Sequence, residues 1–150
     1  MLLAMNEYHE CCSAKYAEKE KTYYCRSCRK RVVLKRGKKK CAHFAHRKTD
    51  NCSVFSEGES EEHLQLKEYF MDWLGQSAEP AFLEAYLPRL RQRPDILLAN
   101  LALEIQCSRL SHQRFVERTK SYLNNGYQVW WILGHSFLGQ RQFSLIEKSC

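Results

Sequence analysis

Hydrophobic residues recur with a helical period in two stretches of the chain, and both stretches have cap residues at their ends. In SEEHLQLKEYFMDWLG the pattern predicts a helix that begins after Ser56 or Ser60 and ends at Gly75. In SHQRFVERTKSYLNNG it predicts a second helix, which begins after Ser111 and ends at Gly126. We expect these two segments to be the helices of the chain.

Between and after these helices, short runs rich in β-branched and aromatic residues predict four strands. The runs are AFLEAYLP, which Pro88 ends, then RPDILLAN, LALEIQCS and YQVWWILG. A tight turn at Ala99, Asn100 and Leu101 joins the second strand to the third, and the tail FLGQRQFSLIEKSC is expected to add an edge strand. The order αβββαβ predicts an α/β layer arrangement with a mixed sheet.

The first third of the chain has a different pattern, with short strands and no helical period. MLLAM and CCSA predict two short strands around the polar turn NEYHE. Strands in TYYC and KRVVLKRG follow, and then a short strand or turn in KKKCAHFAH. The stretch SVFSEGESEE has the composition of a loop. We therefore predict a small β-rich domain over residues 1–56 and an α/β domain over residues 57–150.

A CxxC knuckle in this β-rich segment predicts a zinc site of the zinc-ribbon type. A basic segment of this size has too little apolar material for a core of its own, so a structural metal would stabilise it. In an extended HFAH stretch, His43 and His46 point to opposite sides, so only one of them can reach a given metal. The predicted ligands, with His43 as the alternate to His46, are Cys25, Cys28, His46 and Cys52. Cys41 is a less favoured candidate, because KKKC is typical of the start of a strand. The cysteines without ligand spacing, interpreted as surface or small apolar thiols, are Cys11, Cys12, Cys107 and Cys150.

Positive charge is concentrated in the same segment and predicts an anionic partner. The net charge is +7, from 24 Lys and Arg against 17 Asp and Glu, and nucleic acid is the commonest partner of such a basic region. We expect Lys38, Lys39 and Lys40 to contact DNA phosphates, together with Arg114 and Arg118 on the second helix. Each of these sets is also typical of a solvated protein surface.

The composition, 44% hydrophobic and 27% charged, excludes a disordered chain. No apolar run is long enough to span a bilayer, and MLLAMNEYHE lacks the basic segment and long apolar stretch of a signal peptide. We therefore expect a cytoplasmic protein without a membrane span. Cysteines in that compartment are more often metal ligands than disulfides.

Two carboxylates, Asp95 and Glu104, lie within apolar runs that predict neighbouring strands. They are almost symmetric about Asn100, so a tight hairpin would make them cross-strand neighbours, and like charges so placed repel unless a cation lies between them. Gln106 follows Glu104 by two residues and projects from the same face. Two acids and an amide at one place predict a Mg²⁺ site, and the alternative is exposure of both acids at a sheet edge.

Three polar residues of the first predicted helix, Glu59, His63 and Lys67, have i, i+4, i+8 spacing and share one helical face. Packed beside the strand acids, they would bring an acid, an imidazole and an ammonium group to the same site. Alone, such a stripe is more typical of a solvent-exposed helix.

With PD on the second strand and ExQ on the third, the αβββαβ order resembles the PD-(D/E)xK nuclease fold, which is restriction-endonuclease-like. The whole chain resembles the competence protein CoiA family. The matching segments are MLLAMNE, YYCRSC, HFAH followed by a Cys, GESEEHLQLK, RPDILL, LEIQCSRLS and RFVERTKSYLNNGYQVWWILG. They follow in order from the first residues to about residue 134 and so cover most of the chain.

The resemblance implies a metal-dependent DNA nuclease linked to DNA uptake and recombination. Asp95 and Glu104 would hold the divalent ion, Mg²⁺ or Mn²⁺, and Glu59 matches an acid found on the first helix of some such folds. Gln106 stands where the fold usually has Lys, and Lys67 is a candidate to replace that cation. His63 is a candidate for proton transfer. The expected partner is single-stranded or branched DNA, with recombination proteins as further partners.

Two other functions fit the same residues. The first is a non-catalytic DNA-binding adaptor that uses the nuclease-like fold as a platform, favoured by Gln in the Lys position. The second is a zinc-ribbon regulator that binds a recombinase and has no use for buried acids.

Overall fold

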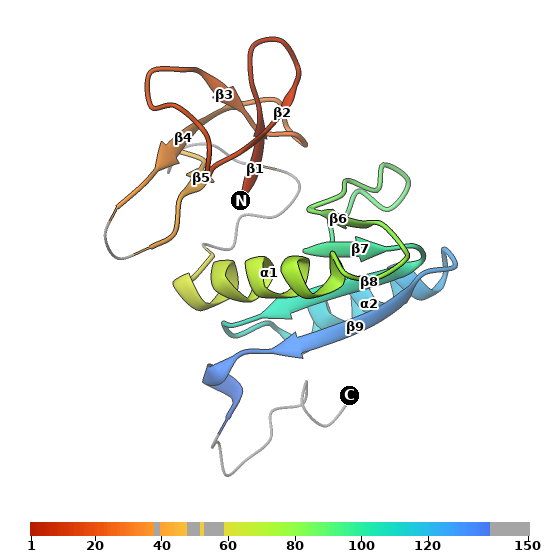
Figure 1. The fold of residues 1–150 in the computed structure, drawn as a ribbon. Coiled ribbons are helices and arrows are strands. Elements are labelled where there is room, and N and C mark those ends of the chain that lie inside the picture. The colour runs from red at the N-terminus through yellow and green to blue at the C-terminus, as the bar shows by residue number, and fades with distance from the viewer. Residues whose placement is uncertain (38–39, 48–51, 53–58, 139–150) are drawn as a thin grey trace.

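The computed structural model describes residues 1–37, 40–47, 52 and 59–138. Two sheets organise these residues, one formed by the first third of the chain and the other by the remainder (Figure 1). The first sheet has the strand order β2-β1-β3-β4-β5, and every described pairing in it is antiparallel. Its strands are β1 (Leu3–Met5), β2 (Cys11–Ser13), β3 (Tyr23–Tyr24), β4 (Arg31–Lys35) and β5 (His43–Ala45).

One face of this five-stranded sheet is buried and forms a small core. Val32 is 3% exposed and Phe44 is 1% exposed, and the rings of Tyr23 and Phe44 pack with centroids 4.9 Å apart. Cys25 and Ala4 complete the same cluster. The segment thus has an apolar core, but it is small enough that a structural metal would add substantial stability.

The second sheet is mixed and has the order β6-β7-β8-β9. The strands β6, β7 and β8 are antiparallel, whereas β8 and β9 are parallel. The elements of this part are α1 (Glu61–Leu74), β6 (Ala81–Leu83), β7 (Ile96–Leu98), β8 (Leu101–Gln106), α2 (His112–Leu123), β9 (Gln128–Leu133) and the short 3-10 helix η1 (His135–Phe137). The predicted αβββαβ order and mixed sheet are therefore confirmed.

The helices α1 and α2 cover opposite faces of the mixed sheet (Figure 1). Side chains alternate along β8, so that Leu103 packs against Leu74 of α1 while Ala102 packs against Tyr122 of α2. The predicted caps are found at Ser60, whose hydroxyl accepts from the His63 amide, and at Ser111. Because β8 is buried on both faces, polar groups on it are held in the interior and need partners there.

Two expectations for the strands need correction or lie outside the described residues. The first strand of the mixed sheet was expected to extend to Pro88, but β6 ends at Leu83 because Glu84 adopts a positive φ of 50°. That conformation breaks the extended chain and turns the Glu84 side chain into the interior, where it is 1% exposed. The expected edge strand in the tail falls on residues 139–150, outside the described part of the chain.

Candidate metal sites and buried charge cluster

Four of the candidate zinc ligands lie together in the structure. Cys25, Cys28, His46 and Cys52 each offer one ligand atom, and these atoms lie within 4.8 Å of one another. The Cys28 Sγ and His46 Nε2 atoms are 3.2 Å apart. Ligand atoms around a tetrahedral zinc ion are roughly 3.5–3.8 Å apart, given Zn–S and Zn–N bonds of about 2.0–2.3 Å. Three thiols and an imidazole in this arrangement fit a structural zinc site.

The local backbone explains why His46, and not His43, joins this group. Phe44 points into the core, and the imidazole of His43 contacts the Cys41 carbonyl oxygen at 2.9 Å instead. On the other side of the site, the CxxC knuckle is closed by the Arg29 amide, which donates to the Cys25 carbonyl oxygen at 3.0 Å. Arg29 has a φ of 61°, so the chain reverses sharply and returns as β4.

A second group that could hold a cation consists of Glu59, His63 and Asp95, again with ligand atoms within 4.8 Å of one another. The His63 Nε2 atom is 3.0 Å from Asp95 Oδ1 and 3.9 Å from Glu59 Oε1. The three side chains are 13–16% exposed, so the group is partly accessible to solvent. Of the predicted helical stripe, His63 and Lys67 lie on α1, whereas Glu59 precedes the N-cap Ser60 and is not helical. Glu59 nevertheless lies with His63 beside Asp95.

Lys67, the third member of the stripe, is buried and surrounded by carboxylates. Its ammonium nitrogen is 2.5 Å from Glu59 Oε1, 2.8 Å from Asp95 Oδ1 and 3.0 Å from Glu84 Oε1. The side chain is 1% exposed, so the alternative of a solvent-exposed stripe does not hold for Lys67. The three carboxylates raise the pKa of Lys67 well above its ordinary value, although burial alone would lower it.

The same network controls the charge of Asp95. Burial alone would raise the pKa of this carboxyl group, but the Lys67 ammonium and the hydrogen bond from His63 hold it well below its usual range. Asp95 is therefore ionised at every physiological pH, as a cation ligand must be.

Glu84 is a member of this cluster that the sequence analysis missed. Its carboxylate accepts from the Leu2 amide at 2.8 Å and from Lys67 at 3.0 Å, so it joins the first strand to the mixed sheet. The sequence does contain an indication of a buried acid here, because Glu84 lies within the apolar run AFLEAYLP. Asp95 and Glu104 lie within apolar runs in the same way. Its role depends on the positive φ that ends β6, which no pattern in the sequence indicates.

The pKa of Glu84 predicts an acid-sensitive fold. Burial would raise this pKa, yet Lys67 and the other nearby positive groups lower it from 4.5 to about 2. Because the pKa is lower in the folded state, Glu84 stabilises the fold above about pH 4.5 and this stability is lost as the pH falls towards 2. We expect the free energy of unfolding to lose roughly 3 kcal/mol from Glu84 over that range. Urea unfolding of Glu84→Gln should show a shallower decrease between these pH values, and an unchanged pH profile would contradict the assignment.

Asp95 lies one residue before β7 and beside β8, because its Oδ2 atom accepts from the Ile105 amide at 2.8 Å. Different helices hold the Asp95 and Glu104 carboxylates. Asp95 interacts with α1 through His63 and Lys67. Glu104 is directed to α2 and is not part of the group of possible cation ligands formed by described residues around Asp95.

The environment of Glu104 is closed. Its Oε1 atom accepts from the Tyr122 hydroxyl at 2.6 Å and forms a close ion pair with the Arg118 guanidinium. Burial raises the pKa of Glu104 to about 7, and nearby Asp95 also raises it, while Arg118 and Tyr122 oppose the shift. Two groups of α2 thus engage Oε1 of Glu104.

Of the other predicted site residues, some are buried with partners inside the protein and others are exposed. Gln106 is 6% exposed, and its Nε2 atom donates to the Ser108 carbonyl oxygen at 2.6 Å. Arg118 was expected to contact phosphate, but it is 9% exposed and its charge pairs with Glu104. Arg114, the other predicted phosphate contact on α2, is exposed.

The predicted lysine run is described only in part. Lys40 is exposed, and its ammonium lies 3.4 Å from the Glu59 carbonyl oxygen, next to the candidate cation group. Lys38 and Lys39 lie outside the described residues.

The core has αβββαβ order and a mixed sheet, with one acid just before its second strand and another on its third. Together with the Cys/His cluster in the preceding β-rich segment, these features define a nuclease-like α/β protein. Two family models match the chain, the nuclease-like domain of competence protein CoiA over residues 59–149 and the N-terminal domain of the same protein over residues 7–55. The chain therefore belongs to the competence protein CoiA family.

The chain is also similar to the curated competence protein CoiA of Bacillus subtilis strain 168. The two are 31% identical over 135 residues, which are 87% of this chain and 36% of the Bacillus protein. This chain thus spans about a third of the length of that relative. No solved structure matches the chain. In the described part of the chain, no helix is both long and apolar enough to cross a membrane.

Proposed function

We propose that this chain is a metal-dependent DNA nuclease that hydrolyses phosphodiester bonds during competence and recombination. The observation that supports it most is the Glu59, His63 and Asp95 group beside Lys67, within a nuclease-like core. Carboxylate oxygens suit Mg²⁺, and the additional imidazole is compatible with Mn²⁺. Asp95 is the central ligand in this proposal, with Glu59 and His63 as partners.

A bound divalent ion would polarise the scissile phosphate and lower the pKa of the attacking water. The protein groups have separate tasks around it. Lys67 stabilises negative charge near Asp95, in place of the cation that Gln106 does not provide. The His63 Nε2 atom lies 3.0 Å from Asp95 Oδ1, so His63 orients the Asp95 carboxylate and is a further ligand in this proposal. Gln106 orients the 107–108 segment through its bond to Ser108.

The Cys25, Cys28, His46 and Cys52 group is proposed to hold one structural zinc ion, which stabilises the small β-rich segment. The division of the chain into domains at residues 56 and 57 is part of the same proposal. Recombination proteins as partners and a cytoplasmic location are proposals that rest on the sequence.

Cleavage assays test the nuclease proposal. Purified protein is incubated with single-stranded, duplex and branched DNA, with added Mg²⁺ or Mn²⁺ and without either, beside the variants Asp95→Ala and Glu104→Ala. We expect cutting only with added metal, and a rate at least about a hundredfold lower in Asp95→Ala, because metal ions supply several kcal/mol of charge stabilisation. Cutting that survives Asp95→Ala would come from a contaminant and would contradict the proposal.

A second candidate is a DNA-binding adaptor without catalytic activity. It is favoured by Lys67, whose ammonium already neutralises the acids of the cluster without a divalent ion. In the cleavage experiment this candidate predicts DNA binding, no cutting with either metal, and no effect of Asp95→Ala on binding.

A further inference from the structure

The outer face of the five-stranded sheet is continuous across three strands. Met5 pairs with Tyr24, and Tyr24 pairs with Arg31. Directly paired residues of antiparallel strands project from the same face, so these three side chains form one row. Tyr23 and Val32 project from the other face and are buried in the core. Tyr24 and Arg31 therefore lie on the face opposite Tyr23 and Val32, where Met5 is 9% exposed and contacts the Arg29 guanidinium.

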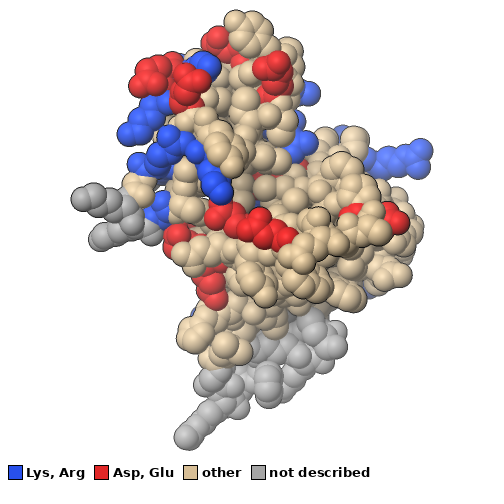
Figure 2. Space-filling view, viewed as in Figure 1, with Lys and Arg blue, Asp and Glu red and all other residues tan. Residues whose placement is uncertain are grey.

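A basic groove of about 680 Å³ runs over β4 on this face. Arg31, Val33 and Lys35 alternate outward along the strand, and all three are exposed. The cations that line the groove are Lys19, Lys21, Arg31, Lys35, Arg36 and Arg47. No acid is among the described residues that line the groove, although Lys21 pairs with Glu18 at 2.7 Å. Figure 2 shows Lys and Arg side chains on the β-rich segment, with Asp and Glu side chains next to them.

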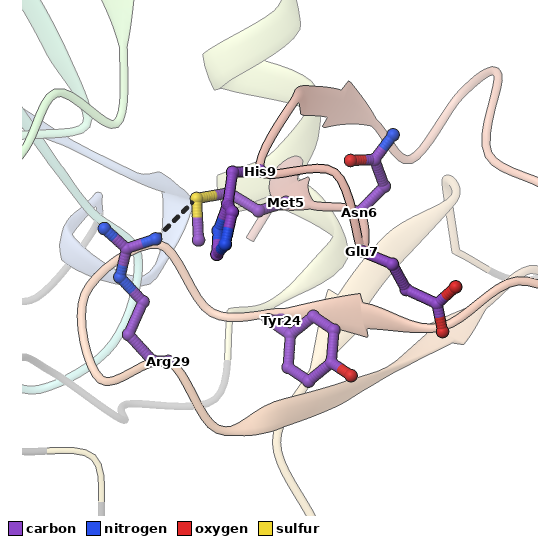
Figure 3. A pocket seen from close by; sticks show the side chains of 6 residues that line it. All are labelled: Met5, Asn6, Glu7, His9, Tyr24 and Arg29. Atoms are coloured by element: carbon purple, nitrogen blue, oxygen red, sulfur yellow. Dashed lines mark hydrogen bonds between the residues drawn. The ribbon is translucent and has the colours of Figure 1, made fainter.

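Beside this groove lies a hollow of about 700 Å³ with an aromatic wall. Figure 3 shows the Tyr24 ring, the His9 ring and the Arg29 guanidinium around it, with Glu7 on the side opposite Arg29. The Arg29 guanidinium contacts the Met5 sulfur at 2.9 Å, a weak acceptor that leaves its positive charge uncompensated by that contact. Because Tyr24 and Arg31 are paired, the hollow and the groove adjoin.

The wall of this hollow is preorganised. The Asn6 side-chain oxygen accepts from the amides of Tyr8 and Glu10, both at 2.9 Å, and fixes the turn between β1 and β2. The CxxC knuckle fixes Arg29 at the opposite side, with a φ of 61°. Both sides of the hollow are thus held by local bonds before any ligand binds.

We propose that this face holds a single strand of DNA, with one base stacked on Tyr24 and the phosphates along Arg31, Lys35 and Arg47. The inference deepens the proposed function, because it names the surface that holds the strand. An aromatic ring beside a row of cations is the arrangement that binds unpaired bases and their backbone without reading sequence. A duplex has its bases stacked inside and cannot place one on Tyr24 without unpairing it.

Fluorescence anisotropy with labelled oligo-dT, in buffer without added Mg²⁺ or Mn²⁺, tests this surface. We expect Tyr24→Ala to weaken binding about tenfold and Tyr24→Phe to bind like the wild type, because stacking requires the ring. The double variant Arg31→Glu/Lys35→Glu should bind oligo-dT at least about tenfold more weakly. The slope of the logarithm of its binding constant against the logarithm of salt concentration should be smaller in magnitude by about 1.4, because two phosphate contacts are lost.

The matched control is Arg109→Glu/Lys120→Glu, which makes the same charge change at exposed residues outside the groove. It should bind much more tightly than Arg31→Glu/Lys35→Glu. Three results would overturn the proposal: equal weakening in the two double variants, wild-type affinity in Tyr24→Ala, or binding of a duplex as tight as that of oligo-dT. Tighter binding of oligo-rU than of oligo-dT would assign the surface to RNA instead. Because binding is measured without the catalytic metal, it is independent of whether Asp95→Ala abolishes cutting.

Discussion

Replacing Cys25 by Ser, or removing the metal with a chelator, is expected to unfold the five-stranded sheet. Cys25 is fully buried between the proposed zinc site and the small core that includes Phe44. Structural zinc contributes on the order of 10–16 kcal/mol to such small segments at neutral pH, more than a core of this size can replace. Bound zinc should be about one ion per chain in the wild type and near zero in Cys25→Ser.

Limited proteolysis and metal analysis measure this outcome together. We expect rapid cleavage within residues 1–52 of Cys25→Ser, while the wild type resists. The control is Cys11→Ser, because Cys11 is exposed and lies outside the ligand group. If Cys25→Ser retained zinc and resisted the protease as the wild type does, the zinc site would be rejected.

The second large effect is expected for Lys67→Met, which should lower the free energy of unfolding by about 3–5 kcal/mol. The ammonium is the shared partner of Glu59, Glu84 and Asp95, and its removal leaves neighbouring carboxylates without that compensation in a buried site. Urea unfolding at pH 7 measures the change.

Lys120→Met is the matched control, because Lys120 is exposed on α2 and its replacement should change stability little. A loss that is equally small in both variants would show that the three carboxylates do not depend on Lys67. Lys67→Met combined with Glu84→Gln should recover part of the lost stability, since it removes one of the unpaired charges.

The sequence predicted the elements of the mixed sheet because their periods and caps are local properties. Ser60, Gly75 and Ser111 lie at the predicted ends of the two helices, and the Ala99–Asn100 turn fixes the β7–β8 register. That register brings Asp95 beside β8, where its carboxylate accepts from the Ile105 amide. The alternation in HFAH likewise separated His43 from His46.

The tertiary partners of the charged residues were not predictable from these local patterns. Whether Glu104 faces Asp95 or Arg118 depends on how α2 packs against β8, which involves residues 14 positions apart in the chain. The positive φ of Glu84 directs its side chain into the buried cluster, and this backbone conformation follows from the tertiary fold. Lys67 illustrates the same limit, because its spacing suits a solvated stripe and only its packing against three acids shows that it is buried.

Binding of Mn²⁺ by the zinc-loaded chain tests the central claim most directly, because it measures the cation site itself without DNA. Calorimetric titration of the wild type should show one Mn²⁺ ion per chain, and Asp95→Asn should bind it at least about tenfold more weakly. Equal Mn²⁺ affinity in the two proteins, or no Mn²⁺ binding by the wild type, would contradict a catalytic cation at Asp95.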